Sequence, residues 1–345
     1  MLKVVMGPRL GIDSWKFEPT DDVLIMDEWI RSDGTDPVEE IIATSSKPKS
    51  ITSEHYIDIK DCSYRDILNP ASAFFYHELE EFSKLPNTPT TQPRNVCFSF
   101  MLNRKRLARL LLIRMVEYFN LTSYNYSLCF SNTAFDASVI IPMIDLSDIK
   151  DKEKLKQVLL GSTALTPKIW HKTSVSTAEN IDNFNYGNHN SLNYAQIIKP
   201  LFDSSIVSII AETVGHERAT TFTEKSLMPV LSMNFPLWFG GYQQAEFFKD
   251  LGFDVFDDVI DHSYQHRNNY LERCYYAIAD NYSILSNLEF ATQQHQKYIT
   301  RLERNKQYAQ SNTCRQRLME RILRSHPDVV TWLTDNFLHN GYYWA

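Results

Sequence analysis

The stretch IVSIIAETVGHERATTFTEKSLMPVLSMNFPLWFGGYQQAEFFKDLGF, residues 206–253, gives the clearest structural signal in the chain. It opens with Ile206–Ala211, an apolar and largely β-branched run of strand length. A polar loop from 213 to 218 follows, and Thr221 is placed to open a helix with an apolar face. A second apolar run, 235–239, ends at two glycines. Strand, polar loop, helix and strand in this order predict a parallel α/β unit.

Polar residues and a glycine come directly after these two strands. Glu212, His216 and Arg218 follow the first strand, and Gly240 follows the second. In parallel sheets, ligands bind beyond the carboxyl ends of the strands. We therefore expect these four residues to belong to a binding site.

An earlier segment repeats the strand–loop–helix pattern with a basic loop. Val96–Met101 is an apolar run, and a leucine-rich helix is expected at 107–119. Between them, Asn103, Arg104 and Arg106 precede the helix start, where free backbone N–H groups and the helix dipole favour an anion such as a nucleotide pyrophosphate. The alternative is that these cations only solvate an exposed turn.

The helix start at 221–225 allows two interpretations. Thr221 and Glu224 have the spacing of a capping box, in which each side chain satisfies a backbone N–H of the other residue. Capping does not account for Lys225, because a lysine in the first turn opposes the helix dipole. Two cation-bearing helix starts after two strands of one sheet would face the same crevice, and a diphosphate between them would resolve both conflicts.

These segments together resemble the donor domain of GT-B glycosyltransferases, most closely the fucosyltransferase-like families. Asn103 with Arg104 or Arg106 matches the phosphate-binding position after the first strand, and Phe222-Thr223-Glu224-Lys225 matches the helix start that contacts the nucleotide sugar. Pro236 and Gly240 fall where those families have a proline-containing strand ending in glycine. The run from 251 to 264 also resembles uncharacterised glycosyltransferase-like proteins of phages and giant viruses. Only Glu212 remains of the Phe-Glu-Asn-Ser strand end of the fucosyltransferases.

The resemblance implies a GT-B-like α/β fold, in which two Rossmann-like domains face a cleft, with a helical C-terminal extension. It implies a GDP- or UDP-sugar as donor and no metal ion. The proline-rich segment 87–94 is the expected linker. We therefore predict an acceptor-side α/β domain at 1–86, a donor-binding domain at 95–285 and the helical extension at 286–345.

Asp27 and Glu28 are the candidates for the catalytic base. They follow a short apolar run at 23–26, and acidic residues just past a strand end are well placed for chemistry. From the opposite domain, either carboxylate could reach across the cleft. The alternative is a loop or helix start whose carboxylates face water.

Composition limits the class of protein. The formal net charge of −7 argues against a protein that coats nucleic acid, although a groove lined by Arg104, Arg109 and C-terminal arginines could contact phosphates. The five cysteines include no Cys-x-x-Cys pair, which predicts reduced thiols and no zinc site. The segment 254–264 mixes Asp and His, but its spacing fits no metal-ligand pattern, so a polar segment is favoured.

The sequence therefore predicts a glycosyltransferase that moves a sugar from a nucleotide-diphosphate sugar to a hydroxyl acceptor, a glycan or a modified DNA base. DNA is the less favoured acceptor because of the net charge. Without a signal-peptide core or a run of about 20 apolar residues, a cytoplasmic protein is expected, in the host cytoplasm if the chain is viral. The alternative is a catalytically inactive structural protein, such as a virion component, that keeps the fold.

Overall fold

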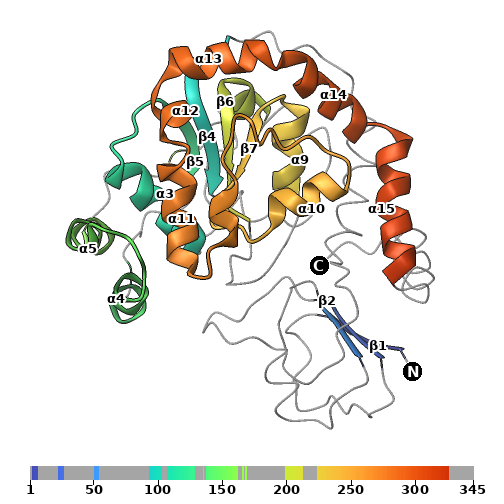
Figure 1. Cartoon of the computed structure of the whole chain (residues 1–345), viewed down its shortest axis with the longest axis horizontal. Coiled ribbons are helices and arrows are strands. Elements are labelled where there is room, and N and C mark those ends of the chain that lie inside the picture. Colours follow the sequence, from blue (N-terminus) through green and yellow to red (C-terminus); the bar gives the residue numbers. More distant parts are fainter. Residues whose placement is uncertain are drawn as a thin grey trace.

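The fold was obtained as a computed structural model of the 345-residue chain. It describes residues 2–6, 22–26, 50–53, 93–102, 107–128, 135, 137–161, 165–166, 168, 199–212 and 224–325. Within these residues the chain forms two parallel sheets and a set of helices around the larger sheet (Figure 1). The protein is therefore of the α/β class, as predicted.

The larger sheet has four parallel strands in the order β5-β4-β6-β7. Their bounds are β4 Val96–Leu102, β5 Tyr124–Leu128, β6 Ser205–Ile210 and β7 Phe235–Trp238. Every residue of β6 and β7 is buried, as expected for parallel strands covered on both faces. The three apolar runs predicted as strands at 96–101, 206–211 and 235–239 are confirmed.

The strand order reverses between β4 and β6. From β4 the chain passes through α3 (Leu107–Tyr118) to β5 on one side, and from β6 it passes through α9 (Glu224–Leu231) to β7 on the other. Right-handed crossovers in opposite directions place the two helices on opposite faces of the sheet. Accordingly, α3 contacts α5 (Lys152–Leu160) and α11 (Tyr270–Ala279), whereas α9 contacts α8 (Lys199–Asp203) and α14 (Ile299–Ala309) (Figure 1).

The C-terminal helices complete the core of this sheet. Their bounds are α10 Gln244–Asp250, α12 Tyr282–Ser286, α13 Leu288–Lys297 and α15 Asn312–Ser325, and a 3-10 turn η3 spans Ser263–His266. Helix α13 lies against β4 and β6, and Ala291 and Leu302 belong to the same apolar cluster as the strands. The sequence predicts two helices here, at 268–288 and 289–323, but the structure has five, α11 to α15, within residues 270–325.

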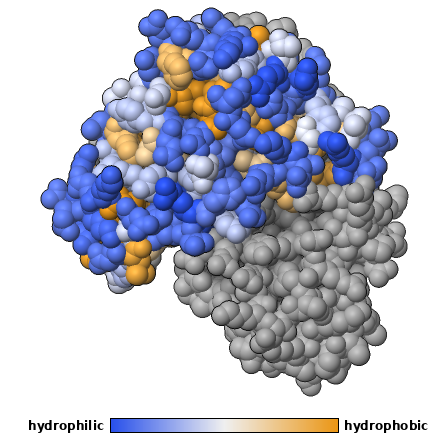
Figure 2. Space-filling model, in the orientation of Figure 1, coloured by the Kyte–Doolittle hydropathy of each residue, from blue (hydrophilic) through white to orange (hydrophobic). Residues whose placement is uncertain are grey.

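Helices α4 (Ala137–Asp145) and α5 pack on the α3 side of the sheet. The charged segment 145–160 predicts a solvated helix; the structure has α5 there, which starts later, at Lys152, and buries Leu155 and Leu159. Buried Arg114 of α3 binds the backbone carbonyl of Gly161 at the end of α5 and pairs with Glu117 at 3.0 Å. The visible surface of the described part is mostly hydrophilic, with apolar residues in smaller areas between (Figure 2).

The smaller sheet comprises β1 (Leu2–Met6), β2 (Asp22–Met26) and β3 (Ser50–Ser53), paired in parallel in that order. The predicted strand at 23–26 is confirmed. Within the described ranges, no helix is long and apolar enough to cross a bilayer. Cys97, Cys274 and Cys314 are buried free thiols.

A polar network joins the amino ends of the larger sheet. Asn234, which is 1 % exposed, donates through Nδ2 to the carbonyl oxygens of Phe202 and Ser205 at 2.9 and 3.0 Å. Its Oδ1 accepts from the Arg94 guanidinium at 3.2 Å, and Arg94 also binds the carbonyls of Ser205 and Ser232. The segment before β4 is thereby tied to the starts of β6 and β7.

We predict that Asn234→Ala lowers the free energy of unfolding by about 2–3 kcal/mol, because the buried hydrogen bonds of this amide to Phe202, Ser205 and Arg94 are lost. Chemical denaturation of the full chain measures the change. Exposed Asn268 supplies the control, and Asn268→Ala should stay within about 0.5 kcal/mol of the wild type. Equal effects of the two substitutions would show that the network does not hold the sheet edge.

The same edge contains a buried histidine, His295, and we therefore expect the stability of the fold to depend on pH. Burial, then the nearby charge of Arg94, lowers the pKa of His295 to about 4, and His295 Nε2 lies 3.0 Å from the Met233 carbonyl. Since the unfolded chain takes up this proton near pH 6.5 and the folded chain does not, stability is complete above about pH 6.5 and falls as the pH drops towards 4, by up to about 3 kcal/mol. His295→Gln keeps a donor without titrating.

Urea denaturation from pH 4 to 7 tests this expectation. The stability of His295→Gln should depend less on pH than that of the wild type, with part of the slope remaining because burial also lowers the pKa of His262. His266, which is exposed, provides the matched control His266→Gln, whose pH profile should follow the wild type. An unchanged slope in His295→Gln would contradict the assignment.

Candidate functional site

The carboxyl edge of the larger sheet contains its topological switch point. β4 ends at Leu102 and its neighbour β6 ends at Ile210, with Phe100 opposite Ile209 in register. The segments that follow the two strands lead to helices on opposite faces of the sheet. In open parallel sheets the crevice between two such segments is the usual ligand site.

A buried hydrogen-bond chain lies at this edge. The Trp238 indole Nε1 at the end of β7 donates to Ser226 Oγ at 2.9 Å, and Ser226 Oγ donates to Glu212 Oε1 at 2.7 Å. Trp238 and Ser226 are fully buried, and Glu212 is 4 % exposed. We call this the Trp238–Ser226–Glu212 chain. It joins the ends of β6 and β7 to the first turn of α9.

This chain fixes the position of the α9 start. Ser226 can serve both neighbours because a hydroxyl has one donor and two acceptor lone pairs. Lys225, the preceding residue, is half-buried in the same first turn. The chain therefore fixes the first turn of α9, which carries Lys225, relative to the ends of β6 and β7.

Gly240 makes a turn immediately after β7. Its φ is +70°, and a Cβ at this position would lie 2.8 Å from both Cys274 Sγ and a ring carbon of Tyr270. Its carbonyl accepts from Arg273 Nε at 3.1 Å, and Arg273 is fully buried. Glycine is thus required here by the left-handed backbone and by the close approach of α11.

The structure describes part of the predicted site. Glu212 accepts from Ser226, the residue after Lys225, and Glu224 is the first described residue of α9. The predicted helix start at Thr221 lies outside the described ranges. The other predicted residues lie outside the described ranges: Asp27, Glu28, Asn103, Arg104, Arg106, His216, Arg218 and Thr223.

Ser226, Trp238 and Arg273 were not predicted as parts of this edge. The only available signal was position, since Ser226 follows Lys225 and Trp238 ends an apolar strand. Their partners lie 12 to 33 residues away, and no local pattern links such distant side chains. Arg273 is buried and holds the Gly240 turn through its hydrogen bond to the Gly240 carbonyl.

Two of the predicted nucleic-acid contacts are corrected. Arg109, expected to line a phosphate-binding groove, is 3 % exposed on α3. Arg301, one of the C-terminal arginines, forms ion pairs with Asp254 at 2.6 Å and Asp258 at 2.7 Å. The Arg109 side chain is thus enclosed by the fold, and the Arg301 side chain is paired with carboxylates of the protein itself.

Acidic and histidine side chains do not form a metal centre in the part of the chain that the structure describes: no three His, Cys, Asp or Glu residues group there in a way that could hold an ion. The chemistry of the described edge is that of backbone N–H donors, a lysine and a fixed carboxylate. This set suits an anionic ligand that also carries hydroxyl groups.

Fold and edge together define a parallel α/β protein whose strand order reverses between β4 and β6. Comparison with models of protein families, with curated proteins and with solved structures finds no match to this chain.

We predict that Ser226→Ala destabilises the fold by about 1–3 kcal/mol, because a buried indole N–H loses its acceptor and a buried carboxylate loses its donor. The exposed Ser283 of α12 gives the control Ser283→Ala, expected near zero. A double-mutant cycle of Ser226→Ala with Glu212→Gln should show a coupling of about 0.5–3 kcal/mol. Strictly additive effects would mean that the two side chains do not act together.

Proposed function

We propose that this protein is a glycosyltransferase that moves a sugar from a nucleotide-diphosphate sugar to a hydroxyl acceptor. The observation that carries the proposal is the strand-order reversal between β4 and β6. The basic segment Asn103–Arg106 directly follows β4, and Arg218 and Lys225 lie between the end of β6 and the first turn of α9. Two cation-bearing segments thus leave neighbouring strands at the same edge.

In the proposed site, the diphosphate lies between these two segments. Arg104, Arg106 and Lys225, with the free N–H groups of the α9 start, neutralise the charge that develops on the leaving group. This assignment removes the need for a divalent ion at the diphosphate. It also gives a reason for cations at helix starts, where the dipole alone disfavours them.

The transfer itself is a substitution at the anomeric carbon. The acceptor hydroxyl forms a bond to that carbon, the bond to the diphosphate oxygen breaks, and the nucleoside diphosphate leaves with the electron pair. The hydroxyl proton passes to a carboxylate if the reaction inverts configuration. We assign this role to Asp27 or Glu28, which directly follow β2 in the sequence.

The remaining predicted residues complete the donor site. His216, Thr223 and Glu224 are proposed to contact the nucleotide sugar, next in sequence to Glu212, which accepts from Ser226. A GT-B arrangement, with the three-stranded sheet on the acceptor side, is the two-domain form of this proposal. It agrees with the parallel pairing in both sheets.

Thermal unfolding with GDP- and UDP-sugars, GDP and UDP, with and without Mg²⁺, tests the donor site. A ligand at about a hundred times its dissociation constant adds roughly 2.7 kcal/mol and should raise the Tm by several degrees. Arg104→Ala or Lys225→Ala should remove most of this shift. Arg304, exposed on α14, supplies the matched control Arg304→Ala, which should keep it.

If the protein binds a nucleotide sugar, the release of nucleoside diphosphate is then measured to test whether it transfers the sugar. Asp27→Asn and Glu28→Gln are expected to keep the Tm shift, and the one that removes the base should lower kcat by at least 100-fold. No shift with any nucleotide, or a shift that Lys225→Ala leaves intact, would overturn the donor site. Binding without turnover in any acceptor mixture would favour the structural-protein alternative.

A further inference from the structure

The segment after β7 brings an aromatic side chain to the carboxyl edge of the larger sheet. β7 ends at Trp238, and Tyr242 follows the Gly240 turn and precedes α10. β7 pairs with β6, and β6 pairs with β4. Because neighbouring strands lie about 5 Å apart, the end of β7 is one strand spacing from the end of β6. Tyr242 therefore follows the strand next to the β4–β6 reversal.

The Tyr242 ring covers a buried guanidinium. The Arg273 Cζ lies over this ring, 5.5 Å from its centroid, and is 5.4 Å from the centroid of the Tyr270 ring. Arg273 is fully buried, whereas Tyr242 is half-buried. One face of the Tyr242 ring is thus turned towards Arg273 inside the fold, and the accessible part of the ring lies on the side away from it.

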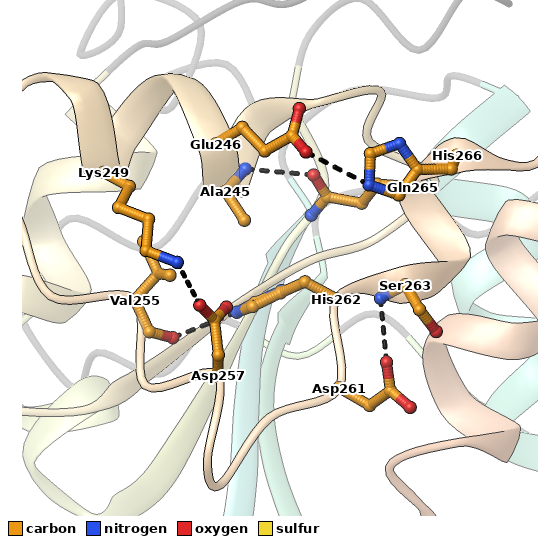
Figure 3. A pocket seen from close by; sticks show the side chains of 10 residues that line it. All are labelled: Ala245, Glu246, Lys249, Val255, Asp257, Asp261, His262, Ser263, Gln265 and His266. Carbon is orange, nitrogen blue, oxygen red and sulfur yellow. Dashed lines mark hydrogen bonds and ion pairs between the residues drawn. The ribbon is translucent and has the colours of Figure 1, made fainter.

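The backbone is fixed on both sides of Tyr242. Before it, the Gly240 carbonyl accepts from Arg273 Nε at 3.1 Å. After it, the Ala245 N–H at the start of α10 donates to Gln265 Oε1 at 3.0 Å (Figure 3). Two ion pairs beside this bond also join α10 to the loop that follows it (Figure 3). A ring held in this way loses little conformational entropy when a ligand stacks on it.

We propose that Tyr242 stacks against the nucleobase of the donor, an inference that rests on the proposed glycosyltransferase function. With the diphosphate between the segments that follow β4 and β6, the ribose and base extend along the edge towards β7, where this ring lies. An aromatic ring stacks with every base, because every base has a π-face. The ring therefore favours a sugar carried on a nucleotide over one carried on a lipid diphosphate, and adds affinity without selecting between uracil and guanine.

Isothermal titration of the full chain with UDP, GDP and inorganic pyrophosphate tests the proposal. Tyr242→Leu should weaken both nucleotides by at least about fivefold, the loss expected for one stacked base, and should leave the affinity for pyrophosphate unchanged. Tyr242→Phe keeps the ring and should bind all three ligands as the wild type does. In Tyr242→Trp, GDP should quench more indole fluorescence than in the wild type, and pyrophosphate should not.

Tyr298→Leu is the matched control. Tyr298 is also half-buried, and the Arg301 Cζ lies over its ring at 4.8 Å from the centroid. It lies at the opposite end of β7, however, where its ring centroid is 6.5 Å from that of Phe235, the first residue of the strand. Tyr298→Leu should therefore leave the affinity for UDP and GDP unchanged.

The outcomes separate the stacking role from the donor site. Nucleotide affinity that Tyr242→Leu leaves intact, or binding of pyrophosphate without UDP or GDP, would overturn the stacking role while the diphosphate site stands. Equal weakening of pyrophosphate and both nucleotides would mean that Tyr242 only maintains the shape of the edge, and would overturn the stacking role as well. A wild type that binds none of the three ligands would overturn the donor site itself, and the stacking role with it.

Discussion

The pairing of β4 with β6 is the constraint on which the rest of the structure depends. The two strands are separated by about a hundred residues, yet they are parallel neighbours, with Phe98 opposite Val207. Both are buried, so their pairing removes apolar surface on two faces at once and sets the register of the sheet. With β4 and β6 paired, β5 and β7 lie on opposite sides of them, and the strand order reverses between the two central strands.

Two polar networks hold the two edges of that sheet. At the amino edge, Asn234 and Arg94 bind carbonyls at the starts of the strands. At the carboxyl edge, Ser226 joins Glu212 to Trp238. A buried polar group lowers the stability of the fold when it is unpaired and requires one geometry when it is paired. Such groups therefore favour one arrangement of strands and helices. The apolar core provides the driving force, and the networks define the register.

The sequence predicts the elements that carry a continuous apolar run. Strands β4, β6 and β7 and helix α3 were found in this way, because strands and helices buried on both faces need apolar residues throughout. Strand β5 was missed, since its sequence Tyr-Asn-Tyr-Ser-Leu at the sheet edge alternates polar groups, and Asn125 bonds Ser204 at 2.9 Å. Strand β3 has a single large apolar residue, Ile51, and gives no signal.

The sequence predicted only those residues of the candidate site whose chemical character is evident from their neighbours in the chain. Cations after a strand can be read from neighbouring residues, whereas the anchoring of Glu212 depends on a serine 14 residues away. The C-terminal helices show the same limit: Asn281, between α11 and α12, bonds the backbone N–H and the carbonyl of Asp261, which lies 20 residues away. No local pattern in the sequence reveals such a contact.

The basic residues fall into two groups, those that bind other parts of the protein and those proposed to bind the ligand. Arg94, Arg114, Arg273 and Arg301 bind carbonyls or carboxylates inside the fold, and each is thereby committed to structure. In the proposed function, an anionic ligand is bound by the cations that follow the two strands in sequence, Arg104, Arg106, Arg218 and Lys225. In this proposal, the segments that carry these residues determine which nucleotide sugar binds. One of these segments follows Glu212, which the Trp238–Ser226–Glu212 chain holds in place. Function carried on loops above a rigid sheet is the general arrangement of parallel α/β proteins.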